Sequence, residues 1–519
     1  MKMKKLAAAL CTAALSLTVM SVTAFAADGV NIEETFTDEN FRTYVSENCD
    51  TDGDGVLSAD EIAEVTYIDC SYSEIGSLEG IENFTALEYL YCNGNKLTEL
   101  DVSGFTELTT LSCGGNQLTE LDVSQNTALK YLSCGSNQLT TLDVTANTAL
   151  EELNCGYNQF KTLDVTANTA LTSLSCYSNN LETLDVSKNT ALEELDCGSN
   201  PLGKLNVTAN TALKYLSCYG NQLTELDVSK NAALISLLCY DNQLEKLDVS
   251  KNTALIYMQC YNNNLTELNV SGCTALTTLD CEYNELTKLD VSGCENLSSL
   301  DCSENKLTEL VVSKNTALIT LYCSSNELPK LDIGGCEKLE YLGCSNNKLT
   351  ELDVSKNTVL FSLSCDYNEL TKLDVSGCKK LDSLYCYNNK LTELDMSGCE
   401  KLAYLYCYNN KLAEIDISGN PNIVKAYTKG EEDEDVPEYI SKDAIGKYYK
   451  DTLTDKDGET YNTYYYFRWD KAAKIITEPT KEPTKPVDNE NKPTGATAGI
   501  AFAGIALAGV ALAVSKKRK

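Results

Sequence analysis

Hydrophobic positions recur with a fixed spacing through most of the chain. Cut every 21 residues from Leu87, the sequence gives slices such as LEYLYCNGNKLTELDVSGFTE and LKYLSCYGNQLTELDVSKNAA, which align without gaps. Cysteine occupies the same position in all sixteen slices, from Cys92 to Cys407. The pattern LxxLxCxxNxLxxLDVSxNxx therefore predicts sixteen repeats over 87–422, with a degenerate copy before them at 65–86.

Within one repeat, apolar and polar residues alternate as they do in a half-buried strand. Leu90 and Cys92 would point to one side while Tyr89 and Tyr91 point to the other. The position of Asn95 is asparagine in all sixteen repeats, which predicts a buried amide that bonds the turn backbone of adjacent coils. The second half, LxxLDVS, alternates in the same way. Each repeat therefore forms one coil, and stacked coils share a continuous core.

This pattern resembles bacterial leucine-rich repeats, specifically the 21-residue class with two nested halves, LxxLxLxxNxLxxLDLxxNxx, with cysteine at one leucine position. The resemblance covers about two thirds of the chain. It implies a repeat solenoid, a leucine-rich-repeat arc with a parallel β-sheet on one face. Because the second half also alternates, we expect strands on both faces and little helix.

The cysteines allow three interpretations. Of the 24 in the sequence, Cys11 lies in the leader, so an odd number, 23, remains and cannot pair completely within one chain. Sixteen occupy the repeated position, and five others replace an asparagine of the second half: Cys273, Cys294, Cys336, Cys378 and Cys399. Stacked side chains would run parallel rather than towards each other, which favours buried free thiols over scattered disulfides or a metal stack.

Two charged columns lie on the predicted second face. One is aspartate in most coils, from Asp101 to Asp416. In the other, ten consecutive coils alternate strictly: Lys204, Glu225, Lys246, Glu267, Lys288, Glu309, Lys330, Glu351, Lys372 and Glu393. Opposite charges on adjacent strands predict structural ion pairs, with weak cation binding as the alternative. A uniform ladder lacks the single carboxylate pair that glycoside hydrolysis requires, so a carbohydrate-active enzyme is a remote third reading.

The segment DTDGDGVLSADE, residues 50–61, matches an EF-hand calcium loop at every ligand position. The predicted metal ligands are Asp50, Asp52, Asp54, Val56 through its carbonyl, Ser58 and Glu61. The flanks fit an incoming and an outgoing helix, with apolar faces made of Phe41, Tyr44 and Val45, and of Ile62 and Val65. An acidic glycine turn is the alternative, and Ser58 with Glu61 also fits a helix capping box. A single loop predicts a structural calcium site that closes the end of the solenoid.

The two ends of the chain predict an extracellular, surface-attached protein. Residues 1–26 have a basic start, an apolar stretch and an Ala-Phe-Ala ending, as secretory signals do. The tail resembles the sorting signals of Gram-positive surface proteins, but Lys492-Pro493-Thr494-Gly495 lacks the residue that those signals place between Pro and Thr. Wall attachment after cleavage and retention in the membrane therefore both stay open.

The predicted organisation follows from these segments. It consists of a signal peptide at 1–26, an EF-hand-like helical N-terminal cap at 27–64, the solenoid at 65–422, a C-terminal capping region at 423–475 with a β-hairpin around Asp457-Gly458, a Pro/Thr-rich stalk at 476–495, an apolar segment at 496–514 and a basic tail at 515–519.

Composition excludes several classes of function. Acidic residues outnumber basic ones 76 to 42, which gives a formal charge of −34 and argues against nucleic-acid binding. The chain has no histidine, so histidine-based catalytic triads and histidine-ligated zinc are excluded. No constellation of catalytic residues emerges, and we expect a protein that is not an enzyme.

Tyrosines on the outward positions of the first-half strands are the candidate ligand-binding face. They form two groups: Tyr215, Tyr219, Tyr240, Tyr257 and Tyr261, and Tyr385, Tyr387, Tyr404, Tyr406 and Tyr408. Tyrosine suits extracellular protein or glycan ligands, although it also fits any β-surface. The favoured hypothesis is a surface binding or adhesion module that docks its ligand on the second group. A passive wall or stalk component is the alternative.

Overall fold

The computed structural model describes residues 29–432, 444–454 and 460–479, and describes no side chain in 452–462. The described residues up to Thr477 belong to one compact unit. The predicted signal peptide, apolar segment and basic tail, the Asp457-Gly458 turn and most of the stalk lie outside the described residues. None of the helices in the described part is both long and apolar enough to cross a bilayer.

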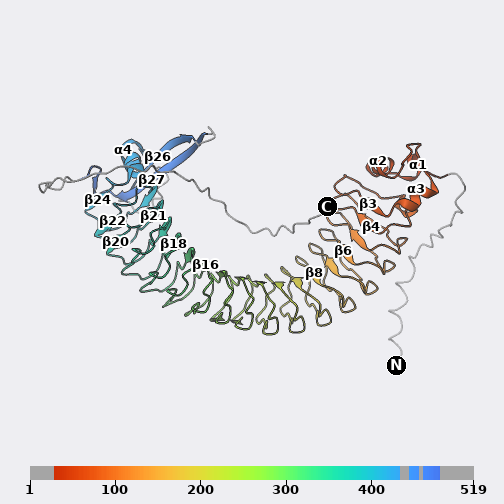
Figure 1. Cartoon of the computed structure of the whole chain (residues 1–519), viewed down its shortest axis with the longest axis horizontal. Coiled ribbons are helices and arrows are strands. Elements are labelled where there is room, and N and C mark those ends of the chain that lie inside the picture. Colours follow the sequence, from red (N-terminus) through yellow and green to blue (C-terminus); the bar gives the residue numbers. More distant parts are fainter. Residues whose placement is uncertain (1–28, 433–443, 455–459, 480–519) are drawn as a thin grey trace, which may run out of the picture. The chain divides into compact units, whose positions relative to one another are not determined.

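Each of the sixteen repeats contributes one three-residue strand to a parallel sheet, and the degenerate copy contributes another (Figure 1). Neighbouring strands pair in register, Leu216 beside Leu237 and Leu237 beside Met258. The predicted solenoid is confirmed. These strands are β3 Tyr67–Asp69, β4 Tyr89–Tyr91, β5 Thr110–Ser112, β6 Tyr131–Ser133, β7 Glu152–Asn154, β8 Ser173–Ser175, β9 Glu194–Asp196, β10 Tyr215–Ser217, β11 Ser236–Leu238, β13 Tyr257–Gln259, β15 Thr278–Asp280, β16 Ser299–Asp301, β17 Thr320–Tyr322, β18 Tyr341–Gly343, β19 Ser362–Ser364, β21 Ser383–Tyr385 and β23 Tyr404–Tyr406.

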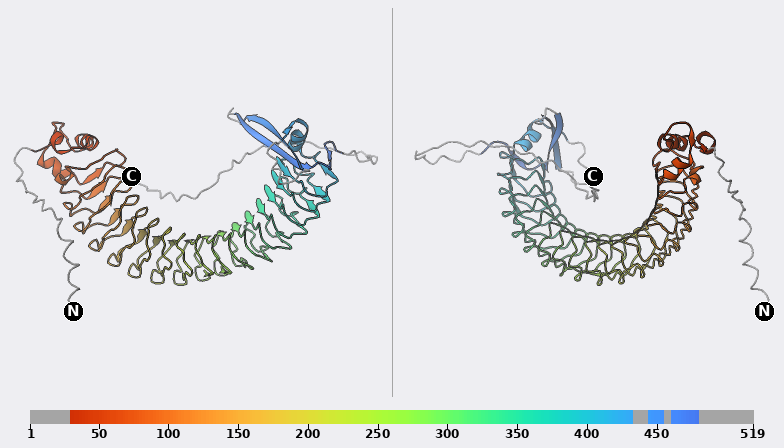
Figure 2. Two further views of the ribbon diagram at one scale, coloured as in Figure 1. Left: turned by 180° about the vertical axis from the view of Figure 1, so that it is seen from behind. Right: turned by 45° about the vertical axis from the view of Figure 1, so that its right-hand side comes forward.

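The alternation in the sequence sets the two sides of this sheet. In β6, Leu132 is buried while Tyr131 is exposed, and Cys134 directly after the strand is buried. We call the outward surface of this sheet the strand face. It consists of the outward side chains of β3 to β23, of the residue before each of these strands, and of the second and third residues after it. Within the unit, the coils stack along a curved path with these strands on its inner side (Figure 2).

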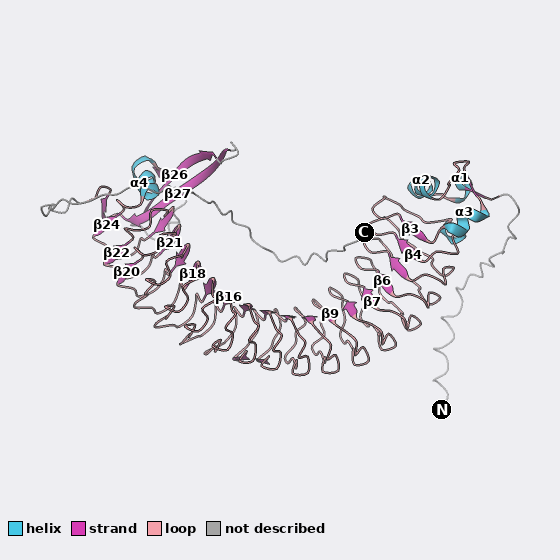
Figure 3. Ribbon diagram, viewed as in Figure 1, coloured by secondary structure: helices cyan, strands magenta, loops and turns pink. Residues whose placement is uncertain are grey.

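The second halves of the repeats form strands in only part of the described solenoid. Short parallel pairs lie at β12 Lys246–Asp248 with β14 Glu267–Asn269, at β20 Lys372–Asp374 with β22 Glu393–Asp395, and at β24 Glu414–Asp416 with β28 Lys474–Ile476. Single bridges link Asp290, Val311 and Asp332. Strands on both faces are therefore confirmed, but the second face is mostly turn and extended chain (Figure 3).

The asparagines of the first half form a hydrogen-bonded ladder, as predicted. Asn116 donates through Nδ2 to the carbonyls of Cys92 and Cys113, at 3.0 Å each, and accepts from the Leu97 N–H at 3.0 Å. One amide thus bonds backbone groups of its own coil and of the preceding coil. This pattern recurs through the solenoid because the turn leaves the same buried groups without strand partners.

A second asparagine ladder lies in the other half of ten of the coils, and it is bonded on one side only. Asn252 donates to the carbonyls of Val228 at 3.0 Å and Asn231 at 2.8 Å, whereas its buried Oδ1 has no donor among the described residues. Cysteine replaces this asparagine in five coils, and Cys273 Sγ lies 3.3 Å from the Val249 carbonyl oxygen. Compared with asparagine, the cysteine thiol still donates to the carbonyl of the preceding coil, and it lacks the Oδ1 atom that has no donor. This accounts for the exchange of the two residue types.

All 23 cysteines from Cys49 to Cys407 are buried, and the described part contains no disulfide between them. Burial raises the pKa of Cys113, Cys239 and Cys323 to about 12. The predicted core position of the cysteines is confirmed, while their oxidation state in solution stays a prediction.

The N-terminal cap contains α1 Ile32–Thr35, α2 Glu39–Asn48 and α3 Ala59–Glu64, with β1 Val30–Asn31 paired antiparallel to β2 Val56–Leu57. A short 3₁₀ helix, η1 Ile81–Asn83, leads into the first full repeat. Phe36, Phe41 and Phe84 pack ring to ring, which joins the helices to the solenoid core. The helices predicted on both sides of the acidic loop are confirmed.

The C-terminal cap begins with α4 Pro421–Lys429, which the repeat pattern did not predict. Next come β25 Glu431–Glu432, β26 Ala444–Thr454 and β27 Thr460–Asp470. β26 and β27 pair antiparallel as the predicted hairpin, and β27 also pairs in parallel with β23, the strand of the last coil. The hairpin thereby covers a sheet edge that would otherwise stay open to another chain.

Candidate functional site

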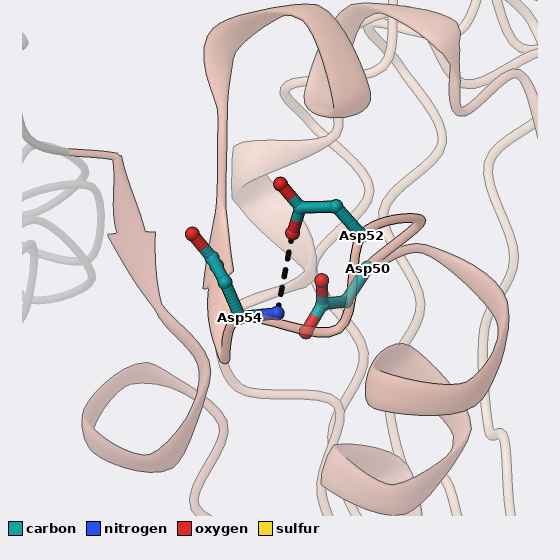
Figure 4. A group of neighbouring side chains, drawn as sticks. All are labelled: Asp50, Asp52 and Asp54. Atoms are coloured by element: carbon teal, nitrogen blue, oxygen red, sulfur yellow. Dashed lines mark hydrogen bonds between the residues drawn. The ribbon is translucent and has the colours of Figure 1, made fainter.

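The acidic loop between α2 and α3 gathers three carboxylates. The ligand atoms of Asp50, Asp52 and Asp54 all lie within 4.8 Å of one another (Figure 4). The chain can turn this tightly because Gly53 and Gly55 adopt φ of +75° and +83°, where a side chain would be strained. Three oxygen ligands brought together on a turn fit a hard divalent cation such as calcium.

Backbone amides hold these carboxylates in place. Asp50 accepts from the N–H of Gly53 at 2.8 Å and of Gly55 at 2.9 Å, while Asp52 accepts from Asp54 and Asp54 accepts from Val56. These bonds use part of the acceptor capacity of each carboxylate, since an ionised carboxylate has about four acceptor sites. The loop is therefore shaped by its own backbone and keeps lone pairs for a cation.

Glu61, the predicted twelfth-position ligand, lies outside this cluster. Its Oε1 accepts from the N–H and hydroxyl of Thr51, and its Oε2 accepts from the N–H and hydroxyl of Ser58. These bonds, led by that of the Ser58 backbone, lower the pKa of Glu61 to about 2. The capping-box alternative is thus present in the structure, and the set of six predicted calcium ligands stays a prediction.

Tyrosines of the first predicted group stack across three coils of the strand face. The ring centroids of Tyr219 and Tyr240 lie 4.8 Å apart, and those of Tyr240 and Tyr261 lie 4.4 Å apart. Tyr215 and Tyr257 belong to β10 and β13, with Ser236 of β11 between them in register. The structure therefore joins three of the five residues in one column, and these rings are half-buried.

The second predicted group packs against the C-terminal cap. Tyr404 stacks on Tyr466 of β27, and the Arg468 guanidinium lies 4.8 Å from the ring centroid of Tyr406. Tyr385 stacks on Tyr406 at 5.0 Å. The strand face is thus occupied here by residues of the same chain.

Tyr408 keeps its place in the outward column, but the predicted exposure is wrong because only 2% of it is exposed. Its ring stacks on Tyr387 at 4.7 Å, next to the coil edge where β27 adds to the sheet. The repeat pattern could not show this burial because β27 lies about 60 residues further along the chain. The ligand-binding role of all ten tyrosines stays a prediction.

Four carboxylates beside the stacked tyrosines were missed by the sequence reasoning: Asp280, Glu282, Asp301 and Glu304. Burial first, and then the charge of Asp301, raises the pKa of Asp280 to about 6. Burial, Asp301, Asp280 and Glu304 together raise the pKa of Glu282 to about 7. Aligning only the outward positions of successive repeats would have revealed these acids, because serine, glycine and asparagine occupy the same columns in many other coils.

The second face carries ion pairs and turn contacts. Lys246 pairs with Glu267 and Lys372 with Glu393, at 2.7 Å in both cases, as the alternation predicted. Its aspartates accept from backbone N–H groups two residues on, as Asp353 does from Ser355 at 2.9 Å. The hydroxyl of Ser355, and then this backbone bond, lower the pKa of Asp353. The uniform acidic column is thereby explained by local structure.

The repeats resemble those of known proteins. Profiles of families described as leucine-rich repeats match residues 106–146, and also 261–282, 345–359 and 387–403. Internalin J of Listeria monocytogenes serotype 4b (strain F2365) is 38% identical over 68 residues, which are 13% of this chain and 7% of that protein. The chain therefore matches a small part of this curated relative.

Two solved structures extend the similarity to the whole fold. The functional domain of InlJ from Listeria monocytogenes, which includes a cysteine ladder, is 30% identical, with a TM-score of 0.56 over 85% of this chain and 99% of that one. A leucine-rich-repeat protein of Leptospira interrogans shares the fold, with 24% identity and a TM-score of 0.57 over 68% of this chain and 92% of that one. The chain belongs to the leucine-rich-repeat proteins and has internalins among its homologues.

Proposed function

We propose that this chain is a bacterial cell-surface binding or adhesion module that holds a protein ligand on its strand face. The observation that carries the proposal is the column of stacked tyrosines, Tyr219, Tyr240 and Tyr261, on the strand face, whereas the second face carries ion pairs such as Lys246 with Glu267. Tyrosine combines a flat apolar ring with a hydroxyl and is frequent among the residues that dominate binding energy. The internalin homologues and the predicted signal and anchor support the surface location.

The tyrosine column can be tested with substitutions that the chain itself uses. Serine occupies the same column in later coils, at Ser303, Ser324 and Ser345, so Tyr240→Ser with Tyr261→Ser is compatible with the fold. We expect this double variant to lose roughly tenfold or more in affinity for the extracellular protein that the wild-type chain captures from an array of proteins and glycans.

The control keeps the strand face and changes the other one. Asp353→Asn with Asp374→Asn should leave that affinity unchanged, because asparagine already occupies the same column at Asn206 and Asn269. Normal binding by the tyrosine variant together with loss in the control would show that the ligand uses the second face. A wild-type chain that captures nothing from the array would favour the passive structural component.

We further propose that calcium stabilises the N-terminal cap. Asp50, Asp52 and Asp54 would hold the ion with the Val56 carbonyl, Ser58 and Glu61, as the EF-hand pattern implies, and the ion would offset the repulsion between the gathered carboxylates. The proposal assigns the ion a structural role, because a single loop has no second site with which to cooperate.

Calcium at about a hundred times its dissociation constant should stabilise the cap by about 2.7 kcal/mol, measured as slower hydrogen exchange in residues 30–64. Asp52→Asn with Asp54→Asn should abolish this increment while keeping the side-chain oxygens that accept from Asp54 and Val56. Glu61→Ala should also abolish it, but with an additional loss of the cap of α3. Identical exchange with calcium and with chelator would refute the calcium site.

A further inference from the structure

The middle of the strand face carries negative charge without any compensating cation. The outward residues of four successive coils, within 235–241, 256–262, 277–283 and 298–304, include five carboxylates and neither lysine nor arginine. The five are Asp241, Asp280, Glu282, Asp301 and Glu304. We call this surface the central acidic face.

The carboxylates crowd one another on adjacent strands. Asp280 on β15 and Asp301 on β16 are paired in register, and Glu282 lies two residues after Asp280. Asp280 accepts a long hydrogen bond from Gln259 Nε2, at 3.4 Å. Burial first, and then the charges of neighbouring carboxylates, raises the pKa of Asp280 and Glu282, and burial raises that of Asp301. Their repulsion would be relieved by a cationic partner.

The same surface offers aromatic rings beside these charges. The sheet register carries the column of Tyr219, Tyr240 and Tyr261 directly into Glu282 on the next coil. Four of the five carboxylates therefore lie on the two coils that follow the stack. A planar cation at this boundary would meet the ring of Tyr261 and the carboxylates of Asp280 and Glu282 together. Guanidinium groups combine stacking on rings with paired hydrogen bonds to carboxylates, which an ammonium group does not.

The chain contains an internal example of a guanidinium that lies on a tyrosine ring of the strand face. Arg468 of β27 lies opposite Tyr406 in the sheet register, with its guanidinium 4.8 Å from the centroid of that ring. Tyr406 in turn stacks on Tyr385. Here an arginine continues a tyrosine column of the strand face, in the place that the next coil would fill.

A metal ion fits the central acidic face less well than a polypeptide does. Among the described residues, Asp50, Asp52 and Asp54 are the group whose ligand atoms converge on one point, and the carboxylates of the central acidic face are not gathered in that way. Neutral sugars would stack on the tyrosines but would leave the charges unrelieved.

We propose that the central acidic face binds an arginine-containing basic segment of a partner protein, with guanidinium groups against Tyr261 and the carboxylates of Asp280, Glu282 and Asp301. This inference rests on the proposed function, since it names the chemistry of the ligand that the strand face holds. It also shifts the binding site away from the tyrosines next to the C-terminal cap, which contact residues of the same chain.

The test uses the full-length chain and three synthetic peptides of equal length, in which serine alternates with arginine, with lysine or with citrulline. Fluorescence anisotropy should show the arginine peptide binding roughly fivefold or more tightly than the lysine peptide, because of stacking. Citrulline keeps the planar shape but loses the charge, so its peptide should not bind measurably. Equal affinity for the arginine and lysine peptides would overturn the guanidinium assignment.

Charge variants separate this surface from the net charge of the chain. Asp280→Asn with Asp301→Asn should weaken binding of the arginine peptide roughly tenfold or more, and asparagine is compatible with this column because Asn154 occupies it. Asp353→Asn with Asp374→Asn removes the same charge from the second face and should change the affinity less than twofold. Equal weakening in both variants would show nonspecific attraction and overturn the proposal.

The pH profile gives an independent readout. Asp280 faces Asp301 on β16, Glu282 on its own coil, and Tyr257, Gln259 and Tyr261 on the preceding coil. A bound cation favours the ionised carboxylates, so affinity for the arginine peptide should be highest above about pH 7. At lower pH, Glu282 and Asp280 become protonated, and affinity should fall about tenfold per pH unit for each carboxylate that must lose its proton on binding. The Asp280→Asn, Asp301→Asn variant should show a flatter profile, and an equally steep one would overturn the assignment.

The two proposals can fail separately. A natural partner that requires Tyr240 and Tyr261 but binds the Asp280→Asn, Asp301→Asn variant normally would refute the basic segment and leave the strand face as the binding surface. Peptide binding that follows every expectation above, with no extracellular partner found, would support this surface and leave the cellular function open.

Discussion

Asn242→Ala is expected to lower the free energy of unfolding by about 3–5 kcal/mol, because several buried backbone groups would lose their partner at once. The Asn242 amide donates to the carbonyls of Cys218, Cys239 and Tyr240, at 3.0–3.1 Å, and its Oδ1 accepts from the N–H groups of Asn221 and Leu223. Alanine replaces none of these bonds. Urea unfolding, combined with hydrogen exchange across residues 213–255, would measure both the size and the location of the loss.

The second asparagine ladder supplies the matched comparison. Asn252 makes two bonds, to the Val228 and Asn231 carbonyls, and its oxygen has no donor among the described residues. Asn252→Cys should therefore change stability by less than about 1 kcal/mol, since cysteine occupies this column at Cys273 and Cys294 with its sulfur near the same type of carbonyl. Comparable losses for Asn242→Ala and Asn252→Cys would contradict the different roles assigned to the two ladders.

These asparagines show why the solenoid could be predicted from the sequence. Each coil makes the same contacts with its neighbour. The 21-residue periodicity of Leu90, Cys92 and Asn95 therefore predicts the contacts between successive coils. The strands, the buried cysteines and the first asparagine ladder all follow from that local rule. The one-sided bonding of Asn252 does not, because it depends on which backbone groups the preceding turn leaves free.

The ends of the solenoid were harder to predict because their contacts do not repeat. Tyr408 follows the outward pattern of its column, yet it is buried where β27, from a distant segment, joins the sheet. In the sequence, Glu61 fits both a calcium ligand and a capping residue. Only the structure shows that its carboxylate accepts hydrogen bonds from Thr51 and Ser58. The loop pattern still gathered Asp50, Asp52 and Asp54, since their spacing is set by a single turn.

Alkaline pH is expected to unfold the reduced protein below the pH at which its lysines titrate. Thiols in unfolded chains have a pKa of about 8.5. Burial raises the pKa of Cys113, Cys239 and Cys323 to about 12, and raises those of the other cysteines of the same column as well. Above pH 8.5 the unfolded chain therefore releases protons that the folded chain retains. The protein is stable below that pH and loses stability as the pH rises towards 12.

The size of this effect follows from the number of thiols. One pH unit above 8.5, each buried thiol lowers the free energy of unfolding by about 1.4 kcal/mol, and every repeat contributes at least one such thiol. Circular dichroism in the presence of a reductant should show cooperative loss of the strand signal between about pH 9 and 10. This range lies below the ordinary pKa of lysine and at or below that of tyrosine.

The cause can be isolated by removing three adjacent thiols. Replacing Cys218, Cys239 and Cys260 by alanine should lower stability at pH 7, because each change leaves a small cavity. It should also reduce the slope of stability against pH by about one and a half protons near pH 8.5 and by nearly three at pH 9.5. Unfolding free energies measured in urea at several pH values between 7.5 and 9.5 give that slope directly. If wild-type stability were constant over this range, the stacked cysteines would have to be paired or otherwise unable to release protons on unfolding, and the free-thiol core would be refuted.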